Sequence, residues 1–369
     1  MKKNDTFDVM VVYSETVAKS ARDTQYKGRS PFPRIGRCGG YNDSYGYLLS
    51  RCKKNSMRAA FTTSRDIIGP GQFQSYWTYN TKWTKHLGKA SSGVLFDKFT
   101  PFTIAQQHRL ELMTSKKSVY IFSNKEMKNI FLNKLNTYIH FKEYAIPTVA
   151  VANPSRLTIA QAKQSLDTVL DHHQYEMDVD DGYILKDQTG SGGYKIYKID
   201  FDSIGSEDIM KYYAHDKKEK KLLSYIFQPF IDCTDGFHFG KYSGFIDLRL
   251  ILLKQKIIQA YIRVAQQGKF KCNEHQGGEL IYIPLSVVPH AVRVMSKMIT
   301  KQLHTTVDLK HSLYALDFIR SNDGNLYFIE GNTNPGIDWD HAKKINEVKS
   351  KELINSIVHE LYLITKERR

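Results

Sequence analysis

Asp317 and Glu330 stand where the sequence pattern could bring two carboxylates together around a metal ion. Apolar runs on both sides of Asn322-Asp323-Gly324-Asn325 predict a β-hairpin, and Asp-Gly is a preferred pair for a two-residue type I′ turn. That turn sets Asp317 opposite Glu330, with Asn332 two residues further along the same face. Opposed carboxylates repel in a bare sheet, so a cation between them would explain the pattern.

The three side chains offer only oxygen donors. Carboxylate and amide oxygens suit Mg²⁺, which keeps several waters and is commonly completed by substrate phosphates. We therefore predict a magnesium site at Asp317, Glu330 and Asn332, with Mn²⁺ as the alternative metal. The competing interpretation of the hairpin alone is a solvated turn with incidental acids.

A glycine-rich stretch upstream predicts a lid that contacts phosphates. The expected strand 182–187 carries Lys186 and leads into Gln188-Thr-Gly-Ser-Gly-Gly193, after which 194–199 alternates apolar and polar residues. Because these glycines join two strands, they fit neither a dinucleotide fingerprint nor a Walker loop, each of which needs a following helix. Backbone N–H groups of such a loop can surround phosphate oxygens, with Lys186 as a nearby point charge. An ordinary mobile hairpin is the alternative.

The remaining elements predict an α/β protein in which short strands alternate with helices. Pro229 predicts that its strand lies at an edge or ends there. The other segments are strands at 7–13, 58–62, 92–101, 118–122, 149–152 and 222–231, a hairpin at 245–263, loops at 69–89 and 270–278, and helices at 42–52, 124–143, 158–172, 284–304 and 346–365.

The composition narrows the class of protein. The chain has 369 residues, of which 41% are hydrophobic, so it can bury sizeable cores in two or three domains. Four scattered cysteines predict neither disulfides nor a zinc site. No long apolar run or apolar leader is present, so we expect a soluble cytoplasmic protein without a membrane partner. The net charge of +15 predicts attraction to anions, but the sequence does not favour nucleic acid as the main partner because no nucleic-acid motif accompanies the charge.

In chain order, these motifs resemble the ATP-grasp superfamily of carboxylate-amine ligases over nearly the whole chain. The family pattern comprises a lysine-bearing strand with a glycine-rich lid, a nucleotide hinge, an Asp-x-Arg strand, an Asn-x-x-x-Gly-Gly loop and an Asp…Glu-x-Asn hairpin. The matching stretches are Lys186 with 189–193, then 228–231, 247–249, 273–278, and finally Asp317, Glu330 and Asn332. The nearest subgroups are the glutamate-adding ligases, the glutathione synthetases and the spore-coat-associated ATP-grasp proteins.

The resemblance implies an α/β (α+β) ATP-grasp fold in three parts. These are a pre-ATP-grasp domain at 1–120, a middle subdomain with the lid at 121–205, and a C-terminal subdomain with the metals at 206–369. ATP would lie between the last two parts. Its expected contacts are Lys134, Lys186, Gly190, Ser191, Gly192, Gly193, Gln228, Pro229, Phe230 and Asp247. Two positions depart from the family pattern, namely Asn133, where aspartate is usual, and Pro229, where glutamate is common.

A ligase of this class activates a carboxylate as an acyl phosphate, which an amine then attacks, releasing ADP and phosphate. The resemblance implies Arg249 and Asn273 as catalytic residues, the first facing the γ-phosphate and the second contacting metal or phosphate. His275 is either a general base or a substrate-orienting or solvent-facing group. The alternatives are a catalytically inactive nucleotide-binding scaffold and a basic nucleic-acid-binding protein. The positive charge predicts at least one acidic substrate; the sequence specifies neither the substrates nor the oligomeric state.

Overall fold

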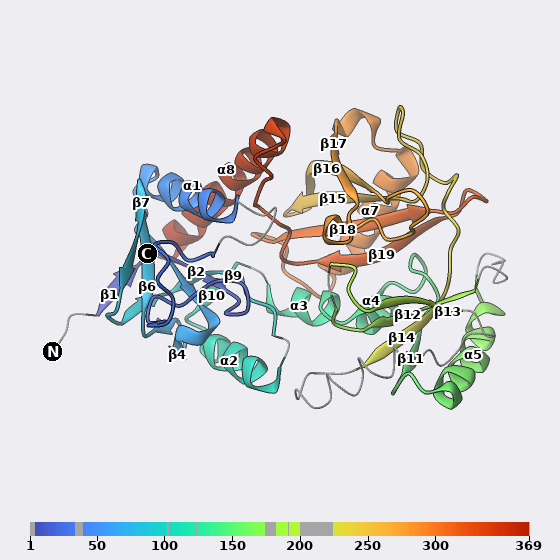
Figure 1. Cartoon of the computed structure of the whole chain (residues 1–369), viewed down its shortest axis with the longest axis horizontal. Helices are drawn as coiled ribbons and strands as arrows, with labels where there is room; N and C mark the ends of the chain where they lie inside the picture. The colour runs from blue at the N-terminus through green and yellow to red at the C-terminus, as the bar shows by residue number, and fades with distance from the viewer. Residues whose placement is uncertain are drawn as a thin grey trace. The chain divides into compact units, whose positions relative to one another are not determined.

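The computed structural model describes residues 4–33, 40–101, 103–122, 124–173, 182–190, 192–199 and 224–368. Ser191 of the predicted lid, the basic run 217–221 and the start of the predicted strand 222–231 lie outside these ranges. The chain divides into two compact units, described separately below (Figure 1). The first comprises Met1–Asn124, Lys310–Leu313 and Asn334–Arg369, and the second comprises Lys125–Leu309 and Tyr314–Thr333.

The first unit is built on a six-stranded sheet of order β10-β9-β2-β3-β6-β7. The strands from β10 to β3 pair in parallel, and the β6–β7 hairpin adds an antiparallel edge. A four-stranded sheet has the order β1-β8-β5-β4, and α1 packs against α8. The strands are β1 (Asp5–Phe7), β2 (Val9–Tyr13), β3 (Ala59–Thr63), β4 (Ile67–Gly69), β5 (Gln72–Phe73), β6 (Tyr76–Asn80), β7 (Lys82–His86), β8 (Ala90–Ser92), β9 (Val94–Lys98) and β10 (Tyr120–Ile121); the helices are α1 (Tyr41–Lys54), η1 (Ser64–Asp66), α2 (Ile104–Thr114) and α8 (Lys344–Glu367).

The smaller sheet of the second unit carries the lid. Its order is β11-β14-β12-β13, with every neighbouring pair antiparallel. Apolar residues of α5 and of the strands share one core, so the helix covers one face. Ser155 caps α5 by accepting a hydrogen bond from the Thr158 N–H, as expected for this residue type. The bounds are β11 (Val149–Val151), α5 (Arg156–Leu170), β12 (Tyr183–Asp187), β13 (Ile196–Ile199) and β14 (Tyr225–Pro229).

The larger sheet of the second unit carries the acidic hairpin and has the order β17-β16-β15-β18-β19. α7 covers one face of this sheet (Figure 1). On that face the central strands are almost wholly apolar, and Val292, Ile299 and Leu303 of α7 enter the same core. The bounds are α3 (Lys125–Phe131), α4 (Lys134–His140), β15 (Ile246–Leu253), β16 (Lys256–Val264), η3 (Glu274–Gln276), β17 (Glu279–Ile283), η4 (Leu285–Val287), α7 (His290–His304), β18 (Leu313–Arg320) and β19 (Leu326–Asn332).

Three predicted elements differ from the structure. The stretch 69–89 is not a loop, because β6 and β7 form a hairpin and the Trp77 side chain of β6 is fully buried. The predicted strand 7–13 is split at Asp8, whose carboxylate accepts the Arg58 N–H, so that β1 and β2 belong to different sheets. The predicted helix 124–143 is two helices, since α3 ends at Phe131 and Asn133 caps the start of α4.

The three-part division at 1–120, 121–205 and 206–369 stays a prediction. β14 lies beyond its second boundary yet pairs with β11 and β12, and α8 belongs to the first compact unit. No helix among the described residues is long and apolar enough to cross a membrane.

Candidate active site

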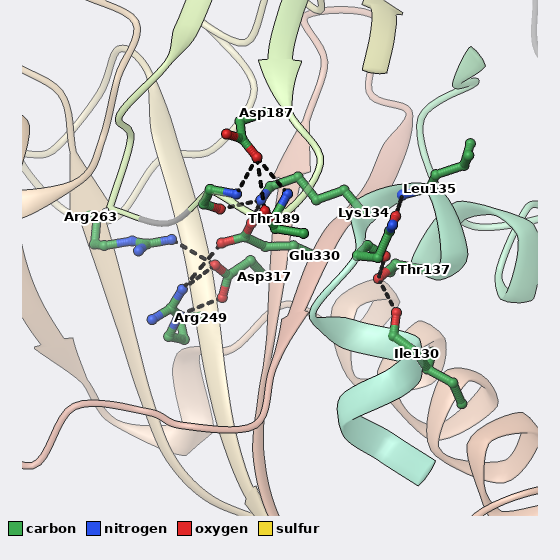
Figure 2. A network of polar contacts seen from close by, with 12 residues as sticks. Ile130, Lys134, Leu135, Thr137, Asp187, Thr189, Arg249, Arg263, Asp317 and Glu330 are labelled. Atoms are coloured by element: carbon green, nitrogen blue, oxygen red, sulfur yellow. Dashed lines mark hydrogen bonds and ion pairs between the residues drawn. The ribbon is translucent and has the colours of Figure 1, made fainter. Parts of the chain in front are cut away.

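Four buried charged residues form one network on β15, β16 and β18. Asp317 accepts hydrogen bonds from Arg249 Nε at 2.5 Å and from Arg263 Nη2 at 2.7 Å, and Arg249 Nη2 donates to its second oxygen (Figure 2). The Nε atom of Arg263 donates to Asp247 Oδ1 at 2.7 Å. All four side chains are at most 9% exposed, so each charge depends on its partners.

The charges in this network move the two carboxyl pKa values apart. Burial opposes ionisation of Asp317, but Arg249 and Arg263 outweigh it and lower the pKa of that carboxyl below its usual range. Asp247 is also buried and has only one close guanidinium partner, so its pKa is raised to about 6. Asp317 therefore stays ionised at neutral pH, whereas the raised pKa of Asp247 brings its titration close to neutral pH.

The hairpin places Asp317 opposite Glu330, as predicted, but by a different route. The connection is the three-residue turn 322–324, closed by a Ser321 N–H to Asn325 C=O bond, and only Gly324 has a positive φ. Arg320 thus pairs with Leu326, and a bulge after Asp317 restores the Asp317–Glu330 pair. The type I′ turn was wrong, since Asp323 does not have the positive φ that it requires.

Glu330 is the more accessible of the two opposed acids. Its side chain is 28% exposed, with Oε1 3.7 Å from Arg249 Nη2 and Oε2 3.9 Å from Lys134 Nζ. Asn332 lies opposite Ala315, two residues further along β19. Among the described residues, no group of three His, Cys, Asp or Glu side chains is placed to hold a metal ion. The oxygen donors fit Mg²⁺ in kind, but both oxygens of Asp317 are already paired with guanidinium groups.

Lys134 and Lys186 reach the same region from different elements. The Asn133 side chain accepts the N–H groups of Leu135 and Asn136, so α4 starts at Lys134, and the Lys134 ammonium donates to the Gly190 carbonyl. Lys186 on β12 is buried. Burial, followed by the nearby charge of Lys134, lowers the pKa of Lys186 to about 8, with Glu330 acting in the opposite direction.

The glycine-rich segment joins β12 and β13, as predicted, and Asp187 shapes it. Asp187 Oδ1 accepts the backbone N–H groups of Thr189 at 2.8 Å and Gly190 at 3.0 Å, together with the Thr189 hydroxyl (Figure 2). Gly193 has φ +76°, and a Cβ there would lie 2.6 Å from Asn273 Oδ1. Glycine is therefore needed at 193 for both its conformation and its close approach to the 273–278 loop.

One pocket in the second unit brings most of the predicted residues together. Phe230 is flanked by Phe245 and Phe270, with ring centroids 5.9 and 5.7 Å away, so one part of the pocket is aromatic. The charged part contains both lysines and the acids. The predicted residues that line the pocket are Lys134, Lys186, Gly190, Gly192, Gly193, Gln228, Pro229, Phe230, Asp247, Asn273, Asp317 and Glu330.

Two predicted residues stand apart from that lining. Arg249 contacts two acids that line the pocket, Asp317 and Glu330, but is not itself part of the described lining. Asn332 is not part of that lining either. Sequence reasoning missed Asp187, Arg263 and Lys271 in the lining. Arg263 had a detectable signal, since it stands at the end of the 245–263 hairpin whose other strand begins near Asp247.

Comparison with solved structures defines the class of protein through its fold. The chain superposes on D-alanyl-alanine synthetase A from Vibrio cholerae with a TM-score of 0.57 and 11% identity, covering 98% of this chain and 99% of that one. A RiPP-associated ATP-grasp ligase from Chryseobacterium gregarium, solved with ADP and a leader and core peptide, gives a TM-score of 0.54 and 16% identity over 96% and 97%. This similarity shows an ATP-grasp fold.

The family follows from the sequence match. The pattern described as the RimK-like ATP-grasp domain matches residues 149–357, and the chain belongs to that family. Similar curated proteins are a "Probable alpha-L-glutamate ligase" from Legionella pneumophila, 33% identical over 27% of this chain and 30% of that protein, and "Probable alpha-L-glutamate ligase 2" from Hahella chejuensis, 29% identical over 32% and 34%. The aligned part thus spans about a third of these relatives. The predicted resemblance and fold class are confirmed.

Proposed function

We propose that this protein is an ATP-dependent carboxylate-amine ligase that releases ADP and phosphate. The observation that carries the proposal is the convergence of Lys134, Lys186 and a glycine-rich lid on one pocket with the Glu330 carboxylate. The cations and backbone N–H groups of the pocket suit a triphosphate, and the Phe230, Phe245 and Phe270 rings that also line it suit a flat base. The names of the curated relatives support a ligase.

The proposed reaction has two steps. A substrate carboxylate oxygen attacks the γ-phosphorus of ATP, the bond to the β–γ bridging oxygen breaks, and ADP departs. The amine nitrogen then attacks the acyl carbon, and the bond from that carbon to the phosphate oxygen breaks. Phosphate departs, the nitrogen gives up one proton, which the departing phosphate can accept, and the amide forms. Both steps shift negative charge among oxygens, so the chain's task is to position cations and to exclude water.

We assign roles to the residues from their charge and position. Lys134 and Lys186 are assigned to offset phosphate charge. Arg249, which lies 3.7 Å from Glu330 but is not part of the pocket lining, is assigned to face the γ-phosphate. The aromatic rings and the hinge at Gln228, Pro229 and Phe230 hold the base, and Asp247 is the candidate ribose contact. Asp187 keeps the lid in shape, and Asn273 meets the lid at Gly193.

A divalent cation fits the oxygen donor atoms of the β18–β19 hairpin. Glu330, Asp317 and Asn332 would hold Mg²⁺, with Mn²⁺ as the alternative, and the bound ion would neutralise phosphate oxygens and orient the γ-phosphate. Because Asp317 is paired with Arg249 and Arg263, the metal has to compete with those guanidinium groups, and Glu330 is the carboxylate open to it.

The same pairing of Asp317 favours a second candidate, a nucleotide-binding scaffold without turnover. An ADP-release assay with Mg-ATP separates the two. Glutamate is the first amino acid to test, because of the names of the relatives, followed by acidic and neutral peptides. Ligase activity predicts ADP release that depends on the added acceptor and is lost in Lys186→Ala but kept in Lys142→Ala, an exposed lysine outside the pocket. Stoichiometric ATP binding without acceptor-dependent ADP release would support the scaffold.

A further inference from the structure

The exposed side of α7 carries two parallel rows of side chains. Val294 and Met298, together with Ala291, form an apolar row, and the first two are 42% and 46% exposed. Arg293, Lys297 and Lys301 follow one another at four-residue spacing and are also exposed, so helical geometry sets them in a row beside the apolar one. We call these six residues the α7 face. None of them lines the pocket described above.

The cations of the α7 face have no acidic neighbour on their own helix. None of the 15 residues of α7 is acidic, and Arg293, Lys297 and Lys301 make no side-chain hydrogen bond or ion pair there. Other long helices differ, since Lys163 pairs with Asp167 on α5 and Lys351 pairs with Glu347 on α8. Like charges at four-residue spacing destabilise a helix, so this row is unfavourable for the isolated protein.

We propose that the α7 face docks an acidic, amphipathic helical segment of a protein or peptide partner. Such a segment would set a row of carboxylates against Arg293, Lys297 and Lys301 and an apolar row against Val294 and Met298. The flexible thioether of Met298 suits a surface that must adapt to another helix. This docking goes beyond the proposed ligation, because it uses residues away from the pocket.

The side chains of the α7 face favour a peptide over a membrane or a nucleic acid. Helices that bind membrane surfaces bury bulky tryptophan, phenylalanine or leucine side chains, whereas the exposed apolar row here contains only Ala291, Val294 and Met298. Single-stranded nucleic acid is commonly held by aromatic stacking, and α7 contains no aromatic residue except its terminal histidines. A row of apolar side chains beside a row of cations matches an acidic amphipathic helix.

Fluorescence anisotropy with a labelled peptide tests the proposal on the full chain. The probe is a peptide of about 18 residues with leucine and glutamate rows at helical spacing, and its control is the same composition in scrambled order. We expect Arg293→Glu/Lys297→Glu/Lys301→Glu to weaken binding by at least about tenfold. The control Lys116→Glu/Lys117→Glu/Lys142→Glu makes the same change of net charge at exposed lysines elsewhere and should weaken it less than about twofold.

Two further variants separate the contribution of charge to binding from that of packing, and they distinguish lost binding from misfolding. Val294→Ser/Met298→Ser should weaken the probe at least about threefold without changing the salt dependence of binding. Arg293→Gln/Lys297→Gln/Lys301→Gln relieves the repulsion within the row, so it should fold and should still lose the probe. Equal losses in the charge-reversal variant and its control, or equal binding of the scrambled peptide, would overturn the proposal. So would tighter binding, through the same three cations, of phosphatidylserine vesicles or of a single-stranded oligonucleotide.

Discussion

Arg263 on β16 bonds to Asp317 on β18 across the strand between them. The Nη2 to Oδ2 distance is 2.7 Å, and β15 lies between the two strands in the sheet. The same guanidinium holds Asp247 on that intervening strand at 2.7 Å. One side chain thus ties three successive strands together where Asp247, Arg263 and Asp317 line the pocket.

Replacing Arg263 by methionine should destabilise the protein by about 3 to 5 kcal/mol at pH 7, the range for breaking a buried ion pair. The reason is that Asp247 loses its close cation and Asp317 loses one of two. Equilibrium urea unfolding measures the change. The double variant Asp247→Asn/Arg263→Met should recover part of the loss, because it leaves one fewer buried charge unpaired. A loss below about 1 kcal/mol for Arg263→Met would show that the network is not needed for stability.

Nucleotide affinity should fall as the pH rises above about 8, because the buried Lys186 loses its proton there. Its folded pKa lies below the ordinary 10.5, so between these values the unfolded chain holds more protons. The contribution of Lys186 to folding stability therefore rises with pH in this window, while its contribution to binding of the phosphates falls.

Titration calorimetry with Mg-ATP at pH 7 and pH 9.5 measures this effect. We expect a decrease of about tenfold in the wild-type protein beyond the change seen in Lys186→Arg, whose guanidinium stays charged. Identical pH profiles for the two proteins would place the ammonium away from the phosphates.

Gly193→Ala should weaken ATP binding by about tenfold while the protein stays folded. The added Cβ would lie 2.6 Å from Asn273 Oδ1, so the lid has to move away from the 273–278 loop. Gly240→Ala is the matched control, because Gly240 also has a positive φ, of +61°, but nothing within 4 Å of the added atom. Both variants carry the backbone cost of about 1 kcal/mol, and only the first carries the steric one. Equal ATP affinities in the two variants would show that ATP binding does not need the close approach of the lid to the 273–278 loop.

Glu330→Gln should abolish nearly all turnover and leave the fold intact. The side chain is 28% exposed and takes no part in the buried bonds of Asp317, so its charge is not needed for stability. Loss of one carboxylate should weaken metal binding, which Mn²⁺ titration followed by electron paramagnetic resonance reads out without turnover. A variant that binds the ion and releases ADP at the wild-type rate would remove Glu330 from the metal site.

The order of elements in the second unit could be predicted because its patterns are local. The period-two alternation and glycines of 182–199 and the apolar runs around Asn322 depend on neighbouring residues alone. The exact pairing of the strands could not be predicted from local patterns, because a bulge after Asp317 and another after Ile251 each shift the register by one residue. The second bulge sets Arg263 opposite Asp247, whereas the turn alone would set it opposite Ile246.

The break at Asn133 escaped prediction for a related reason. The apolar spacing of 124–143 continues through it, and only the capping bonds to Leu135 and Asn136 show that a new helix begins. The partners of Asn133 explain the break, because its amide also donates to Gln188 at the start of the lid. The hairpin of β6 and β7 was missed because its aromatic residues alternate only weakly, with Thr81 at a positive φ in the turn.

The fate of the carboxylate oxygen tests the proposed ligation most directly. With ¹⁸O in both oxygens of the activated carboxylate, each turnover should transfer one ¹⁸O to the released phosphate, because the acyl carbon leaves that oxygen on phosphorus when the amine attacks. Mass spectrometry of the released phosphate measures the transfer, and the nucleotide product should be ADP. Ligation through an acyl phosphate predicts one labelled oxygen per phosphate. Unlabelled phosphate, or AMP and pyrophosphate in place of ADP, would show that the reaction takes another route.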